Sequence, residues 1–232
     1  MAGHTVKAFD DELGQLRALV SEMGGLAEAA IDEAIQALVR RDLGGAARVV
    51  DQDRRIDALE AEIETQVVRM IALRAPMADD LREILAAMKI SGVIERMGDY
   101  AKNIAKRVPL LQDSRGIEPL SILPAMARLV SEMVHDVLDA FVARDPKAAI
   151  AVCESDRAVD DFYNSLFRTL LTYMLENPHT ITSATHLLFI AKNLERIGDH
   201  ATNVAEMIYF AATGRHMVER AKHDDTLTVI PE

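Results

Sequence analysis

A short acidic segment that occurs twice is the part of this chain best suited to chemistry. Residues 95–105 read ERMGDYAKNIA, and residues 195–205, which begin 100 positions later, read ERIGDHATNVA. A Glu, a Gly, an Asp and an Asn recur in fixed order together with the apolar positions. Carboxylate and amide oxygens bind hard or borderline cations such as Mg²⁺, Mn²⁺, Ca²⁺ and iron. The repeat therefore predicts oxygen-ligand chemistry built twice on a duplicated scaffold.

The spacing of the polar residues predicts one stripe on each of two helices. Glu95, Asp99 and Asn103 are four apart, so their side chains stack along a helix. At about 100° per residue they lie on the side opposite the apolar stripe of the same segment. The second copy supplies the same three residue types, Glu195, Asp199 and Asn203. We expect both stripes to face away from the core.

Each copy is preceded by a second acidic pair. Asp53 and Asp57 flank the apolar stripe of an earlier segment, and a shift of 103 residues leads to Asp156 and Asp160. If neighbouring helices bring the pairs together, four carboxylates converge in each half. Like charges at this spacing destabilise a helix by about 0.2–0.5 kcal/mol per pair. With few basic residues nearby in the sequence, a bound cation is the expected source of neutralisation.

The candidate metal ligands combine the two sets. They are Asp53, Asp57, Glu95, Asp99, Asn103, Asp156, Asp160, Glu195, Asp199, Asn203 and His200. His200 stands at the position of Tyr100 in the first copy. Its ring nitrogen adds a type of ligand that zinc prefers. The competing interpretation is a solvated helix face, paired with Arg96, Lys102 or Arg196.

Helical periodicity fills the chain between sparse glycines and prolines. The expected helices span residues 8–41, 46–73, 78–108, 122–144, 147–175 and 183–212, with a break at residues 43–45. We divide the chain into a first three-helix repeat (1–112), a linker (113–119), a second three-helix repeat (120–214) and a polar C-terminal tail (215–232). The predicted fold is all-α, with six helices in two pseudo-symmetric three-helix bundles.

The composition argues against several classes of protein. Of 232 residues, 50% are hydrophobic, which is ample for a core, and the formal net charge of −11 argues against a nucleic-acid binder. The single cysteine, Cys153, excludes an internal disulfide. The first residues are too polar for a signal peptide, and the apolar runs are too short to span a bilayer. We expect a cytoplasmic protein without direct membrane insertion.

The two acidic segments, with Asp80-Leu81-Arg82, resemble the PhoU family of phosphate-uptake regulators, and the resemblance covers nearly the whole chain. It implies multinuclear iron or zinc clusters on the acidic pairs, whereas the oxygen donors by themselves also suit Mg or Mn. It further implies a non-enzymatic negative regulator of phosphate uptake and of the phosphate-starvation response. Such a protein links the ATPase subunit of the phosphate ABC transporter to a phosphate-sensing histidine kinase, commonly as a homodimer. The longer polar tail departs from the family pattern.

Two alternatives stay open at the level of the sequence. The first is a carboxylate-bridged metalloenzyme, and the second is a metal-free helical scaffold. Di-iron bundles use a Glu-x-x-His pair on each of two helices, whereas this chain has one such pair, Glu132 and His135. The sequence therefore favours the regulatory adaptor over the enzyme.

Overall fold

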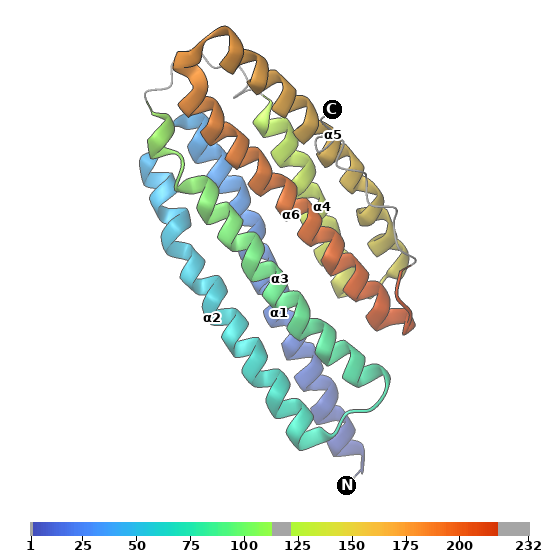
Figure 1. The fold of residues 1–232 in the computed structure, drawn as a ribbon. Coiled ribbons are helices and arrows are strands. Elements are labelled where there is room, and N and C mark those ends of the chain that lie inside the picture. The colour runs from blue at the N-terminus through green and yellow to red at the C-terminus, as the bar shows by residue number, and fades with distance from the viewer. Residues whose placement is uncertain (1, 113–121, 218–232) are drawn as a thin grey trace.

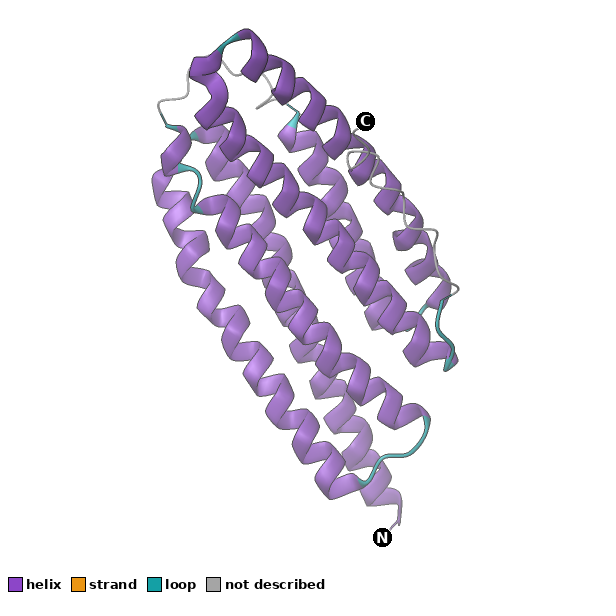
Figure 2. Ribbon diagram, viewed as in Figure 1, coloured by secondary structure: helices purple, strands orange, loops and turns teal. Residues whose placement is uncertain are grey.

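The computed structural model describes residues 2–112 and 122–217, with side chains from residue 8 onward. These residues form six α-helices, two short 3₁₀ helices and no strand (Figures 1 and 2). The α-helices are α1 (Ala2–Arg40), α2 (Leu43–Arg74), α3 (Asp79–Ala105), α4 (Leu123–Ala143), α5 (Pro146–Glu176) and α6 (Ile181–Thr213), and the 3₁₀ helices are η1 (Pro109–Leu111) and η3 (Pro178–Thr180). The predicted all-α class is confirmed.

The helices assemble as two bundles of three that lie side by side. Helices α1, α2 and α3 pack together, as do α4, α5 and α6 (Figure 1). The bundles meet where α3 packs on α6 and α1 packs on α4. Each helix at the junction therefore contacts its counterpart from the other repeat, which is the arrangement expected of a duplicated unit.

Aliphatic side chains fill both bundles, and the repeat register holds in the core. Ile56 and Ile63 of α2 are buried, and so are their counterparts Val159 and Leu166 of α5. Burying a side chain of this size stabilises the fold by about 1.5–3 kcal/mol. The 103-residue shift read from the sequence thus corresponds to equivalent positions in three dimensions.

The expected break at residues 43–45 is wrong. α2 begins at Leu43, and the chain turns at Arg41, whose φ is 55°. Gly45 lies inside the first turn of α2, where an added Cβ would sit 2.7 Å from Oδ2 of Asp42. The glycine therefore lies within the helix, close to the Asp42 side chain, and does not stop the helix. α3 ends at Ala105, earlier than expected, because the chain tightens into turns before η1.

Part of the predicted division lies outside the described residues. This applies to the linker at 113–119 and to the tail from residue 218, so those boundaries stay predictions. The start of the tail is described: Met217 packs against the core, and the His216 ring stacks on Phe210 with centroids 4.6 Å apart. In the described ranges, no helix has an apolar stretch of the length that a bilayer crossing requires.

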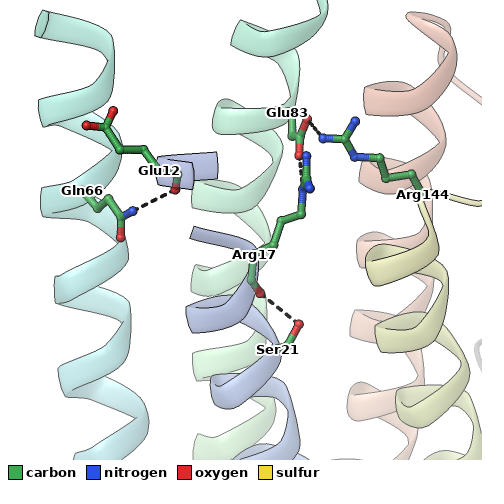
Figure 3. Close-up of polar contacts among 6 residues, drawn as sticks. All are labelled: Glu12, Arg17, Ser21, Gln66, Glu83 and Arg144. Atoms are coloured by element: carbon green, nitrogen blue, oxygen red, sulfur yellow. Dashed lines mark hydrogen bonds and ion pairs between the residues drawn. The ribbon is translucent and has the colours of Figure 1, made fainter. Parts of the chain in front are cut away.

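Glu83 joins the two bundles at one end. It accepts a hydrogen bond from Nε of Arg17 in α1 at 2.5 Å, and it pairs closely with Arg144 at the end of α4 (Figure 3). The Glu83 side chain is 15% exposed. Burial raises the pKa of Glu83 above its ordinary value, and the hydrogen bond from Arg17 opposes that rise. One half-buried carboxylate therefore holds an arginine from each repeat.

We expect Glu83→Ala to lower the free energy of unfolding by about 1–3 kcal/mol, because the partly buried hydrogen bonds from both arginines are lost. Glu22→Ala is the matched control, since Glu22 pairs with Arg55 at 2.7 Å between exposed side chains. That change should cost less than about 1 kcal/mol. Urea unfolding followed by circular dichroism measures the free energy of unfolding of both variants. Equal decreases in the two variants would contradict the stabilising role of Glu83 between the bundles.

Candidate metal centre

The first acidic pairs meet in the groove between α2 and α3. The α2–α3 cluster consists of Asp53, Asp57, Glu60, Glu95 and Asp99. Burial raises the pKa of Glu95, and the charges of the other four carboxylates raise it further. The two pairs thus lie near enough in this half for their charges to act on one another. Sequence reasoning missed Glu60, because its counterpart in the second repeat is Tyr163 and the comparison of repeats passed over it.

A lysine lies inside the α2–α3 cluster. The Lys102 ammonium donates to Oδ1 of Asp99 at 2.7 Å and pairs closely with the buried carboxylate of Asp53. Burial lowers the pKa of Lys102, but the hydrogen bonds to Asp53 and Asp99 raise it more, so the net shift is upward. The expectation that few bases lie near these carboxylates is wrong in this half.

The second pairs meet in the groove between α5 and α6. The α5–α6 cluster consists of Asp156, Asp160, Glu195 and Asp199. Burial raises the pKa of Asp199 to about 6, and the charges of Asp156 and Asp160 contribute to the rise. Burial also raises the pKa of Glu195, against the opposing effect of its hydrogen bond from Lys192.

The Glu195 carboxylate is only partly satisfied. Its Oε1 accepts from the Lys192 ammonium at 2.6 Å, and that ammonium also lies 5.1 Å from the centre of the Tyr163 ring. Its Oε2 is buried and meets no hydrogen-bond donor among the described residues. A buried anionic oxygen without a donor is costly, and a cation would relieve that cost.

The stripes face solvent only in part. Asn103, Asn203 and Asp199 are exposed as expected, whereas the Glu195 side chain is 13% exposed. Asp53, which flanks the core stripe of α2, is 5% exposed. The helical wheel places one core direction per helix, whereas α3 contacts α1, α2 and α6. The side opposite the apolar stripe is therefore partly covered by a neighbouring helix.

Gly98 and Gly198 lie where the paired helices approach most closely to the acids. A Cβ on Gly98 would sit 2.8 Å from Cδ1 of Ile56 and 3.5 Å from Oδ1 of Asp53. A Cβ on Gly198 would sit 3.5 Å from Oδ1 of Asp156. Each glycine costs its helix roughly 1 kcal/mol relative to Ala. A close approach is present only at Gly98, because a Cβ at Gly198 would make ordinary contacts.

The remaining predicted ligands lie elsewhere on α3 and α6. Asn103 and Asn203 are exposed, and Nδ2 of Asn203 lies 3.3 Å from Nδ1 of His200. The His200 ring packs against Tyr100, with centroids 5.4 Å apart, at the junction of the bundles. Burial lowers the pKa of His200, and the charges of nearby arginines lower it further. The structure thus places His200 between the repeats and against Tyr100, in the α3–α6 junction.

The two clusters fit a metal ion unequally. Within residues 2–112 and 122–217, no three His, Cys, Asp or Glu side chains converge closely enough to hold one ion. Both clusters nevertheless offer the oxygen donors that hard cations prefer. Lys102 lies between carboxylates of the α2–α3 cluster, whereas Glu195 leaves one buried oxygen without a donor in the α5–α6 cluster. The α5–α6 cluster is therefore the better fit.

Comparison with known proteins gives consistent matches over the whole fold. The pattern of the PhoU domain matches residues 20–108 and again 123–208. The "Phosphate-specific transport system accessory protein PhoU homolog" of Zymomonas mobilis is 60% identical over 225 residues, which cover 97% of this chain and 95% of that protein. Its namesake in Caulobacter vibrioides is 49% identical over 232 residues, covering 98% and 100%.

Solved structures show the same architecture. The crystal structure of PhoU from Pseudomonas aeruginosa superimposes with a TM-score of 0.86 at 35% identity, covering 89% of this chain and all of that one. The phosphate transport system regulatory protein PhoU from Streptococcus pneumoniae gives a TM-score of 0.86 at 29% identity, covering 91% and 100%.

The raised pKa of Asp199 predicts a pH-dependent effect of its removal in metal-free protein. A folded-state pKa above the unfolded one means that ionisation costs stability, so the cost is absent below 3.8 and complete above about 6. Asp199→Asn should therefore stabilise the protein above about pH 7, by about 0.5–1 kcal/mol after solvent screening.

The gain should vanish as the pH falls towards about 4. Thermal unfolding at several pH values measures it, with Asp136→Asn on α4 as an exposed control outside the cluster. A gain that does not depend on pH would contradict the assignment to Asp199.

Proposed function

Because this chain belongs to the PhoU family, we propose that it is an accessory protein of a phosphate-specific transport system that restrains phosphate uptake and the phosphate-starvation response. The observation that carries the proposal is the 60% identity, over nearly the full length of both chains, to a protein that bears that name. The matched relatives are named as accessory or regulatory proteins. A regulatory role is therefore preferred to catalysis.

We further propose that the chain connects the ATPase subunit of the phosphate ABC transporter to a phosphate-sensing histidine kinase. Two long bundles joined along α1, α3, α4 and α6 leave faces of α2 and α5 for such contacts (Figure 1). The net charge of −11 favours basic partner surfaces. An ABC ATPase works in the cytoplasm, which is then the place of this chain. Formation of a homodimer stays a prediction.

We also propose that the carboxylates bind metal ions, with iron or zinc first and Mg or Mn as alternatives. The support lies in the α5–α6 cluster, where Asp156, Asp160, Glu195 and Asp199 would hold the ions. Burial raises the pKa of Asp199, and the charges of Asp156 and Asp160 add to the rise. The positive charge of a bound ion would offset both effects. Glu195 offers a buried oxygen that has no donor among the described residues.

Affinity capture and a deletion strain test the regulatory role. The tagged chain, captured from phosphate-replete cells, should recover the transporter ATPase subunit and the sensor kinase, identified by mass spectrometry. A strain lacking the chain should express phosphate-starvation genes in replete medium, and expression of the wild-type chain should restore repression. Normal repression in the deletion strain would overturn the proposal. Metal-dependent turnover without either partner would favour the metalloenzyme instead.

Metal analysis of the purified protein tests the cation proposal. We expect iron or zinc in the wild-type protein and a loss of at least about tenfold in affinity in the double variant Asp156→Asn/Asp199→Asn, because two anionic donors become neutral. The control is Asp136→Asn/Asp139→Asn, which removes two exposed charges from α4. Mass spectrometry of the elements gives the content. Equal metal in the two double variants would remove the α5–α6 cluster from consideration.

A further inference from the structure

Arg107, at one end of the junction between the bundles, has no acidic partner among the described residues. It lies in the turn between α3 and η1. At the other end of α3, Arg17 and Arg144 both pair with Glu83. Burial lowers the pKa of Arg107, and no carboxylate in the described part of the chain opposes that effect. A partly buried guanidinium therefore lacks the anion that usually accompanies it.

Two side chains of α6 hold the guanidinium in place. Nη1 of Arg107 lies 3.2 Å from Nδ1 of His186, and the guanidinium carbon lies 4.3 Å from the centre of the Phe189 ring. Because arginine has no acceptor, Nδ1 of His186 accepts this hydrogen bond and the ring proton is on Nε2. Burial lowers the pKa of His186, and the charge of Arg107 lowers it further. Both contacts thus leave the positive charge of Arg107 uncompensated.

Most of the hydrogen-bond donors of Arg107 have no acceptor. Its Nε is buried and meets none in the described ranges, where the bond to His186 is the only side-chain hydrogen bond of this arginine. A guanidinium carries five N–H donors in a planar fork, which matches a carboxylate or a phosphate group. The side chain is therefore held ready for an oxyanion.

Exposed apolar surface adjoins the guanidinium. Phe189 is 50% exposed although Arg107 lies over its ring, and Leu110 is 57% exposed. The Leu110 amide donates to the backbone oxygen of Arg107 at 3.1 Å, and η1 packs on α6. We call these residues, with His186, the Arg107 patch. An arginine beside an exposed aromatic ring is typical of the residues that dominate protein–protein binding.

The second repeat shows that the fold does not require these polar residues. In the 100-residue register, Arg107 and His186 correspond to Met207 and Ala86. Ala86 is buried and Met207 packs against the core. Two apolar residues thus take the equivalent places at the other end of the contact between α3 and α6. Since apolar replacements at a packed contact are often neutral or stabilising, packing does not explain the arginine.

The charges around the Arg107 patch favour an acidic partner. Lys106, which precedes Arg107, is exposed, and the first turn of α6 contains no acidic residue. That turn is also the positive end of the α6 dipole. Arg41 lies at the same end of the molecule, where it donates to the backbone oxygen of Gln112 at 2.7 Å. This end is therefore positive although the whole chain has a net charge of −11.

We infer that the Arg107 patch binds an acidic segment of a protein partner, with a carboxylate on Arg107 and an apolar side chain on Phe189 and Leu110. The inference rests on the proposed function and assigns one of its partner contacts to the place where α3, η1 and α6 meet. The carboxylate accepts charge-assisted hydrogen bonds from the guanidinium. The apolar side chain covers surface that the described residues leave exposed.

Binding measurements on the full chain test the inference. The probes are the purified transporter ATPase subunit and the purified cytoplasmic part of the sensor kinase. Arg107→Met introduces the residue that the second repeat has at this position. Lys106→Met is the matched control, because it removes one exposed charge from the neighbouring position. Isothermal titration calorimetry at low and at high salt gives the affinities.

Arg107→Met should weaken the binding of one partner by about tenfold or more, because a central arginine contact is lost. It should also reduce the salt dependence of that affinity. Lys106→Met should change the affinity by less than about threefold. Phe189→Ala should weaken binding of the same partner, and Arg107→Lys, which lacks the planar fork, should not restore full affinity.

Thermal unfolding separates a lost contact from a lost fold. Arg107→Met should melt at or above the temperature of the wild-type protein, whereas an arginine with a purely structural role would melt lower on replacement. If the wild-type chain binds a partner and Arg107→Met binds it equally well, the inference is overturned and the proposed function stands. If the wild-type chain binds neither partner, the proposed function itself fails.

Inorganic phosphate provides the last arm of the test. Phosphate that binds the wild-type chain but not Arg107→Met, with partner affinity equal in the two proteins, would assign the patch to a free anion and overturn the inference. Phosphate that only competes weakly with the partner agrees with it, because the ion lacks the apolar part of the proposed segment.

Discussion

The packing of α2 on α3 and of α5 on α6 brings carboxylates from both helices of each pair near one another. The approach is fixed by the apolar side chains beneath it, Ile56 in one bundle and Val159 in the other, both of which are buried. Core packing thus holds the acids together against their repulsion. Burial raises the pKa values of Glu95 and Asp199, and that repulsion raises them further. A cation bound there would therefore interact with carboxylates whose positions are set by the packing of the core.

The junction between the repeats depends on a different interaction. Tyr100 and His200, which are equivalent positions, pack against each other with tilted rings where α3 meets α6, and the Arg196 guanidinium lies 5.8 Å from the centre of the Tyr100 ring. Glu83 holds an arginine from each repeat at another point of the same contact. Each acidic segment therefore has two faces. One face carries the acids that lie near the acids of the neighbouring helix in the same bundle, and the other packs against the second bundle.

Duplication followed by local change explains why the grooves are similar without being equal. The apolar register and the acidic pairs persist, whereas the residues at positions 60, 92 and 102 differ from their counterparts at 163, 192 and 202. Such changes are cheap for the fold, because they lie at the edge of the groove and not in the core. Their effect on the electrostatic potential is large, because each change adds or removes a charge beside several neighbouring carboxylates.

The sequence by itself determined the helical class, the duplication, the core register and the identity of most of the clustered acids, because periodicity and repetition are properties of the chain alone. It did not determine which acids are buried, because a helical wheel gives one apolar direction and does not show the further helices that pack against the same helix. It also missed Glu60, the bridging position of Lys102 and the packing of His200 on Tyr100. Those features arise where residues far apart in the sequence are brought together, and only the packing of helices sets such contacts.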